Sequence, residues 1–81
     1  MYRLMDGRAE ALEFVAVADA PYIGVPLKNL TVRENTLIAV IVRGGQVVIP
    51  FGNDHIEPED TVIIMSKEQG LDDLGDILKH T

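Results

Sequence analysis

The chain has 81 residues, of which 47% are hydrophobic and none is cysteine, and its formal net charge is −6. This length allows one small domain or one piece of a longer protein, with a thin core that buries about 60–65% of the unfolded chain's surface. The acidity argues against nucleic acid and anionic lipid as partners, because both require a basic face. The absence of cysteine excludes disulfides and fits a reducing, cytoplasmic location.

The N-terminal residues show no targeting segment, since residues 1–10 are too charged for a signal peptide. The longest aliphatic run covers residues 37–42, which is far short of the ~20 residues that a transmembrane helix needs. We therefore expect a soluble domain that does not insert into the membrane directly.

The first predicted strand covers residues 9–17, where Leu12, Phe14 and Ala16 share one face. Residues 22–30 are too short and too interrupted for a long helix, and one to two helical turns are expected there. Pro26 suits a first helical position, and Leu27 and Leu30 are spaced to pack on a sheet.

Two β-branched runs, residues 36–42 and 47–50, are joined by Gly44-Gly45, which is typical of a two-residue hairpin turn. Pro50 ends the second run, since proline cannot donate to a strand ladder. A tight turn at residues 57–60, with Pro58 in its second position, leads into a fourth strand over residues 61–65.

A C-terminal helix is predicted over residues 70–79, because its leucines and isoleucine at positions 71, 74, 77 and 78 form one stripe. Ser66 and Gln69 have the spacing of a capping box just before it.

The two runs at residues 37–42 and 62–65 are apolar at both parities, so both faces of these strands should be dry. The predicted helices cover about one face. We therefore expect an α+β fold: a four-stranded, mainly antiparallel sheet or partly closed barrel, with its remaining apolar surface buried in a homodimer.

Catalytic chemistry is hard to assemble from these residues. Ser66 is the only serine, and neither His55 nor His80 has a second ligand at metal spacing. The acidic residues between Asp54 and Asp60 could hold a hard cation or form a solvated turn. Arg33 could pair with a carboxylate or with the phosphate of a ligand. We expect neither an enzyme nor a metal site.

Taken together, the segments resemble the C-terminal domain of regulators of potassium conductance, the RCK_C or TrkA-C family. The matching pieces are residues 9–15 (AEALEFV), 23–30 (IGVPLKNL), 37–45 (LIAVIVRGG), 48–50 (VIP) and 56–64 (IEPEDTVII), in the family's order and spacing. The tail at residues 70–78 resembles the end of the Trk-type potassium uptake regulator. Glu59 departs from the family, which usually carries Gly there; a type I turn would accommodate it without a positive φ.

The resemblance implies that residues 1–81 are one regulatory domain of a longer protein with an upstream Rossmann domain. In this family such a pair lies on the cytoplasmic side of a membrane-embedded potassium channel or transporter. NAD or ATP would then belong to the upstream domain, since this chain has no Gly-x-Gly-x-x-Gly. Some relatives bind cyclic di-AMP in the cleft between two such domains, and the positions that carry over by alignment are Leu30, Val32, Arg33, Asn35 and Pro50.

Two alternatives remain open. The same ligand-sensing module also attaches to cation/proton antiporters and to transcription regulators, and it could equally be a structural dimerisation scaffold without a ligand.

Overall fold

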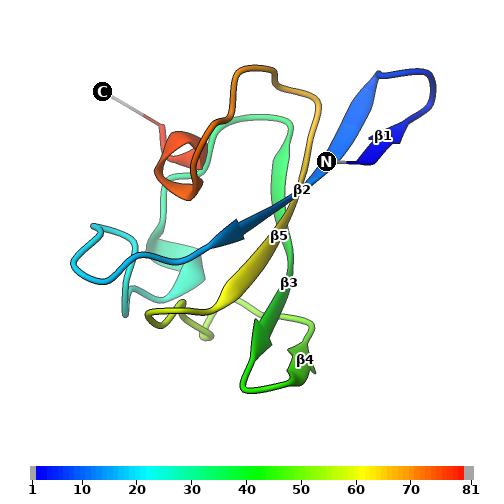
Figure 1. Cartoon of the computed structure of the whole chain (residues 1–81). Coiled ribbons are helices and arrows are strands. Elements are labelled where there is room, and N and C mark those ends of the chain that lie inside the picture. The colour runs from blue at the N-terminus through cyan, green and yellow to red at the C-terminus, as the bar shows by residue number, and fades with distance from the viewer. Residues whose placement is uncertain (1, 80–81) are drawn as a thin grey trace.

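A computed structural model describes residues 2–79 and shows one antiparallel sheet among them (Figure 1). Its strands are β1 (Tyr2–Leu4), β2 (Ala9–Val15), β3 (Thr36–Arg43), β4 (Gln46–Val48) and β5 (Thr61–Ser66). Their order across the sheet is β1-β2-β5-β3-β4. The last strand in sequence is therefore central, and it pairs with β2 and β3 over its whole length.

The four predicted strands are confirmed, with ends that differ by one or two residues. A fifth strand, β1, was not predicted because its three residues are too few to show a pattern. It pairs with β2 across a turn in which Met5, Asp6 and Gly7 all have positive φ.

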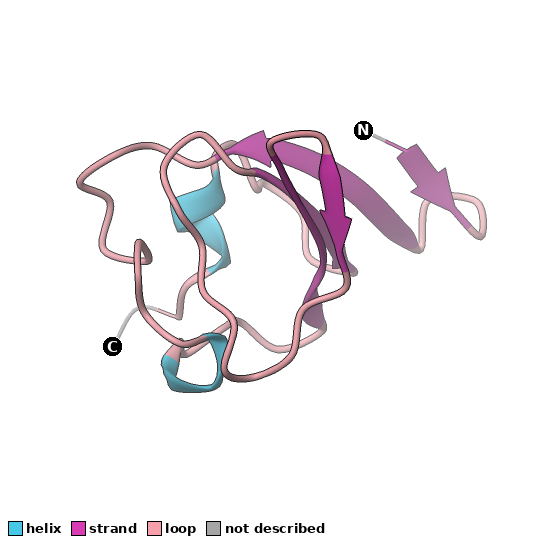
Figure 2. Ribbon diagram, turned by 90° about the horizontal axis from the view of Figure 1, so that it is seen from below, coloured by secondary structure: helices cyan, strands magenta, loops and turns pink. Residues whose placement is uncertain are grey.

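The prediction of a partly closed barrel is wrong, because the sheet is open and its edge strands β1 and β4 lie at opposite margins (Figures 1 and 2). β1 pairs only with residues 9–11, and β4 pairs only with residues 41–43. Closure would need long strands with a consistent stagger, which these edge strands do not supply. Long loops cover one face of the sheet instead.

The two predicted turns are present. Gly44 and Gly45 have φ values of 55° and 80°, as a type I′ hairpin turn requires. In the second turn the Asp60 N–H donates to the Glu57 carbonyl, and Glu59 has φ 71°. A positive φ at this position defines a type II turn, so the type I turn that would have spared Glu59 a positive φ does not form.

The short helical segment after β2 is confirmed as a single 3-10 turn, η1 (Leu27–Asn29), with Pro26 at its N-cap rather than inside it. The prediction of a C-terminal helix is wrong. The region contains only the 3-10 turn η2 (Leu74–Ile77), whose N-terminus is closed by reciprocal side-chain contacts of Asp73 and Asp76.

Two interactions explain why the C-terminal segment is not an α-helix. Val32 and Leu78 form an isolated antiparallel bridge, which holds the segment after η2 extended. Ser66 is not a helix cap but the last residue of β5, where its buried hydroxyl bonds the Thr36 hydroxyl and accepts from the Glu68 N–H. The apolar stripe therefore reports burial of this segment, not helical periodicity.

The core lies on one face of the sheet, between the strands and the loops that cross them (Figure 2). Leu12, Ile41, Val62 and Ile64 project from the strands into it, and every one of them is nearly inaccessible to water. The loops and η2 contribute the remaining buried apolar side chains: Ala16, Tyr22, Ile56, Leu71, Leu74 and Ile77.

Candidate functional site

A groove of about 420 Å³ lies beside η1, which we call the η1 groove. Its walls come from three parts of the chain: η1 and the segment after it, the first half of β3, and the loop after β4. The apolar side chains that line it are Leu27, Leu30, Val32, Leu37, Ile38, Pro50 and Phe51, and Lys28 supplies a cation.

Backbone pairing between two loops fixes one wall of the η1 groove. The Leu27 N–H donates to the Asp54 carbonyl at 2.8 Å, and the Lys28 N–H donates to the Gly52 carbonyl at 2.9 Å. These bonds hold η1 against the loop that carries Pro50 and Phe51. The tight packing is visible at Gly52, where an added Cβ would lie 3.1 Å from the Lys28 Cβ.

The opposite wall is the first half of β3. Because β4 pairs only with residues 41–43, the described part of the chain supplies no strand partner for the outer side of residues 36–40. A β-bulge at Ala39 interrupts the register between Ile38 and Val40 in the same stretch. The groove therefore runs along an incomplete sheet edge, which loops rather than a strand enclose.

Three of the five residues carried over from the family meet in this groove: Leu30, Val32 and Pro50. They come from segments about twenty residues apart in sequence, so the fold gathers them. Arg33 and Asn35 are not among the lining residues.

Both of the remaining candidates have a structural role in the backbone. The Arg33 N–H donates to the Ile77 carbonyl at 2.8 Å, while its side chain is half-buried and makes no hydrogen bond or ion pair with any described residue. Asn35 has φ 60°, and its carbonyl accepts from the Lys67 N–H. Asparagine tolerates this left-handed conformation better than most residues, which accounts for Asn35 without a ligand.

Sequence reasoning missed Lys28 and Phe51 as groove residues. Phe51 has 77% of its surface exposed, an unusual position for one of only two phenylalanines in the chain. Its place directly after Pro50, outside any strand pattern, was the available signal. An aromatic face and a lysine on one apolar groove can together accept a flat ring and an anionic group.

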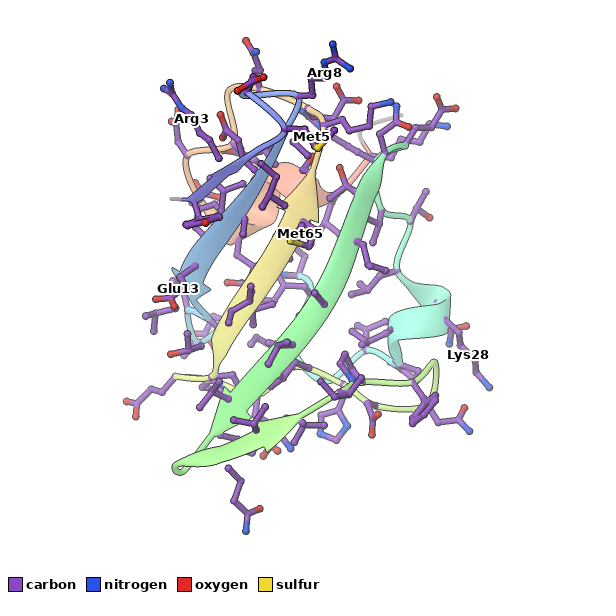
Figure 3. All side chains as sticks on the ribbon, turned by 90° about the vertical axis from the view of Figure 1, so that its right-hand side faces the viewer. Arg3, Met5, Arg8, Glu13, Lys28 and Met65 are labelled. Carbon is purple, nitrogen blue, oxygen red and sulfur yellow. The ribbon has the colours of Figure 1, made fainter. Side chains whose placement is uncertain are left out.

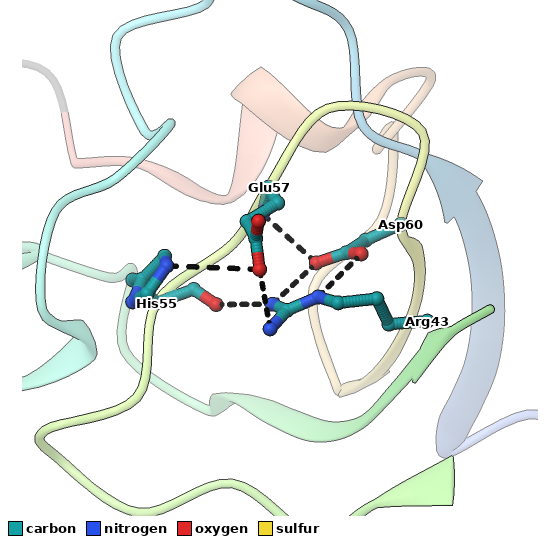
Figure 4. Close-up of polar contacts among 4 residues, drawn as sticks. All are labelled: Arg43, His55, Glu57 and Asp60. Carbon is teal, nitrogen blue, oxygen red and sulfur yellow. Dashed lines mark hydrogen bonds and ion pairs between the residues drawn. The ribbon is translucent and has the colours of Figure 1, made fainter. Parts of the chain in front are cut away.

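Of the acidic residues considered as cation ligands, Glu57 and Asp60 bind an arginine instead (Figure 4). The Asp60 carboxylate accepts from Arg43 Nε at 2.9 Å, from Arg43 Nη2 at 2.8 Å and from the Glu57 N–H at 2.8 Å. Arg43 also donates to the His55 carbonyl and forms an ion pair with Glu57. Within residues 2–79 no cluster of acidic or histidine side chains has the arrangement of a metal site.

Asp60 is therefore not part of a solvated turn, because only 1% of its surface is exposed. Burial by itself raises the pKa of the Asp60 carboxyl, but the hydrogen bonds from Arg43 and from the Glu57 N–H outweigh it and place the pKa below the ordinary 3.8. The hydrogen bond with Asp60 likewise raises the pKa of Arg43. This cluster ties the β3–β4 hairpin to the Pro58 turn and so has a structural role.

The serine and the histidines that were considered for catalysis complete the list of candidate residues. The Ser66 hydroxyl is buried and already hydrogen-bonded, and His55 Nε2 lies 3.8 Å from the Glu57 carboxylate. His80 lies outside the described residues. No helix among the described residues has the length and hydropathy needed to cross a membrane.

The TrkA-C domain model matches residues 11–79, and the chain belongs to this family. Among curated relatives it is 33% identical over 72 residues to a Trk system potassium uptake protein TrkA homolog of Pyrococcus abyssi, covering 88% of this chain and 32% of that protein. It is 29% identical over 66 residues to the Trk system potassium uptake protein TrkA of Azorhizobium caulinodans, covering 82% and 14%. The chain thus spans well under half the length of these relatives.

The fold also occurs in a solved structure described as an RCK domain with cda. The TM-score is 0.69 at 19% identity, and the match covers 85% of this chain and 97% of that one. The resemblance to this family drawn from the sequence is therefore confirmed, and the open five-stranded sheet is the RCK-like fold.

Proposed function

We propose that this chain is a non-catalytic regulatory domain of a Trk-type potassium uptake system, and that the η1 groove binds a small anionic ligand between two copies. The observation that carries the proposal is the convergence of Leu30, Val32 and Pro50 on one groove in a chain of the TrkA-C family. The two relatives compared above are potassium uptake proteins, which supports a role in potassium transport.

The ligand that we propose is cyclic di-AMP. Its two adenine rings suit an apolar groove with an exposed phenylalanine, and each of its phosphates suits one basic side chain per copy. Lys28 lies in the groove, and Arg33 follows directly after the groove residue Val32, with no partner for its side chain among the described residues. A ligand with two-fold symmetry matches a site that two identical copies share.

The full-length protein would then carry an upstream Rossmann domain that binds NAD or ATP, and it would contact a membrane-embedded potassium transporter from the cytoplasm. This chain would contribute neither nucleic-acid binding nor membrane insertion. Ligand binding that favours one dimer geometry over another would shift the assembly toward that geometry and so regulate transport.

Titration calorimetry with cyclic di-AMP tests the ligand. We expect the wild-type chain to bind, and we expect Lys28→Ala and Arg33→Ala each to weaken binding about tenfold or more, because each removes a charge-assisted hydrogen bond worth about 1.5–3 kcal/mol. Arg3→Ala is the matched control, since it removes the same charge from β1 at the opposite margin of the sheet. It should bind like the wild type.

The rival assignments give different results. A dimerisation scaffold without a ligand would give no heat at high micromolar cyclic di-AMP, and that result would remove the sensor proposal. Equal loss of binding in Arg3→Ala would show that overall charge, not the groove, controls affinity. A module of an antiporter or of a transcription regulator would bind in the same way, and the sequence encoded upstream of this domain would distinguish it.

A further inference from the structure

A second cavity, of about 360 Å³, lies between the end of β2, the loop that follows it and η2, and we call it the β2 pocket. Figures 1 and 2 both show η2 beside the end of β2. The β2 pocket shares no lining residue with the η1 groove, so it is a separate feature of the fold.

Hydrogen bonds within the chain fix both walls of the β2 pocket. In the loop after β2, the Tyr22 hydroxyl accepts a hydrogen bond from the Val17 N–H at 3.0 Å. At the start of η2, the Asp76 carboxylate accepts hydrogen bonds from the N–H groups of Asp72 and Asp73. The pocket is therefore largely preformed, as binding sites usually are.

The β2 pocket combines an apolar lining with two exposed carboxylates. Phe14, Tyr22 and Leu74 supply apolar surface, and two of them are aromatic. Asp72 and Asp73 also line the pocket, and neither forms an ion pair with another described residue. No lysine or arginine of residues 2–79 lines it. A basic side chain fits this combination, because its aliphatic stem packs on the rings while its charge meets the carboxylates.

The outer edge of β2 is unpaired where it borders the pocket. β1 pairs only with residues 9–11, whereas β5 pairs with the inner edge of β2 as far as Val15. The described part of the chain supplies no strand partner for the outer side of residues 12–15. Figure 3 shows Glu13 at this margin, with Arg3 and Arg8 toward the other end of β2. A free strand edge of this kind accepts an additional strand.

We propose that the β2 pocket and this strand edge bind an extended segment of a partner protein in which basic and apolar residues alternate. When the segment pairs with residues 12–15, its successive side chains point to opposite faces of the sheet. Basic side chains then enter the pocket on the face of Phe14. Apolar side chains lie on the opposite face beside Val15, of which 62% is exposed.

Charge complementarity favours this partner. The chain has a formal net charge of −6, so it attracts a basic segment as a whole, and the pocket adds two carboxylates at the point of contact. The η1 groove has the opposite character, since Lys28 lines it and no acidic residue does. The proposal therefore goes beyond the proposed function: one site takes an anionic ligand and the other takes a basic polypeptide.

Fluorescence polarisation with a labelled hexapeptide, VRVRVR, at physiological ionic strength tests the proposal. We expect the 81-residue chain to bind it. Val17→Lys places a like charge on the pocket wall and should weaken binding about tenfold or more. Val17 is 64% exposed, so this variant should fold, and circular dichroism checks that it does. Asp72→Asn removes one carboxylate and should weaken binding about fivefold.

Val47→Lys is the matched control, because it makes the same change at a valine that is 68% exposed on β4, at the opposite margin of the sheet. It should bind VRVRVR like the wild type. N-acetylarginine amide is the second control, since it carries the same cation but cannot form a strand. It should displace the labelled peptide only at concentrations about a hundredfold or more above the peptide's dissociation constant.

Three results would overturn the proposal. The first is no binding of VRVRVR at high micromolar concentration, and the second is an equal loss of binding in Val17→Lys and Val47→Lys. The third is displacement by N-acetylarginine amide at the peptide's own dissociation constant, which would indicate a site for a small cation. Cyclic di-AMP binding should be unchanged in Val17→Lys, so failure here is distinguishable from failure of the proposed function.

Discussion

Replacing Arg43 by Met removes the guanidinium but keeps most of the aliphatic stem, and it leaves the buried Asp60 carboxylate with only one of its three hydrogen bonds, that from the Glu57 N–H. Removing one partner of a buried ion pair costs about 3–5 kcal/mol. Since 40% of the Arg43 side chain is exposed, we take the lower end, about 3 kcal/mol. The total free energy of unfolding of a domain of this size is about 4–12 kcal/mol, so this loss is a large part of it.

The reciprocal change should cost less. Asp60→Asn leaves Arg43 at a half-exposed position, where water and Glu57 still solvate its charge. The loss is then mainly that of charge-assisted hydrogen bonds, and we expect about 2 kcal/mol. The double variant should be more stable than the sum of the two single effects predicts, because it buries no unpaired charge.

Urea denaturation followed by circular dichroism measures these differences, with Arg8→Met as the matched control. Arg8 is exposed in the turn after β1, so its loss should change the free energy of unfolding by no more than about 0.5 kcal/mol. The reasoning fails if Arg43→Met costs less than about 1 kcal/mol, or if Asp60→Asn proves the more damaging of the two.

Acid should destabilise the wild type through Asp60, because the pKa of this carboxyl is lower in the folded than in the unfolded state. Its contribution to the free energy of unfolding is complete above the ordinary pKa of 3.8 and is lost as pH falls toward the folded pKa. Below pH 3.8 the pH dependence of unfolding should therefore be shallower in Asp60→Asn, and identical slopes would contradict the assignment. Glu59→Gly should raise the free energy of unfolding by about 1 kcal/mol, since Glu59 has φ 71° and glycine adopts this conformation without strain. Thermal melts of this variant are compared with those of Glu59→Ala, which keeps the strain, to show whether only glycine stabilises the fold. Tyr22→Phe should lower the free energy of unfolding by about 1–2 kcal/mol, because the Tyr22 hydroxyl accepts a hydrogen bond from the Val17 N–H at 3.0 Å and its loss leaves that donor without its partner. A melting temperature equal to that of the wild type would show that water replaces the bond.

Local signals in the sequence were enough for four of the five strands and for the positions of both predicted turns. Alternation in residues 9–15, the Gly44-Gly45 pair and the Pro58 turn each reflect steric preferences of a few adjacent residues, and the structure confirms the elements they predict. The family resemblance needed only the order and spacing of such segments. The type of the Pro58 turn was not accessible, because Glu59 is held at positive φ by contacts from elsewhere, among them its N–H bond to the Ala16 carbonyl.

The site was predictable only in part. Leu30, Val32 and Pro50 were named by alignment. Lys28 and Phe51 were missed, although the place of Phe51 directly after Pro50 was a local signal. Their meeting depends on backbone bonds between η1 and a loop more than twenty residues later.

By itself the sequence determined that this is a small, acidic domain of the TrkA-C family, built on an antiparallel sheet with more apolar strand surface than the predicted helices could cover. Only the tertiary structure decided that the sheet stays open, that the C-terminal segment is extended around one 3-10 turn, and that Asp60 pairs with Arg43. The physical reason is the separation along the sequence of the residues whose interactions decide each feature. Strands and turns follow from the conformational preferences of neighbouring residues, whereas closure, helix choice and ion pairing depend on groups that meet only after the chain has folded.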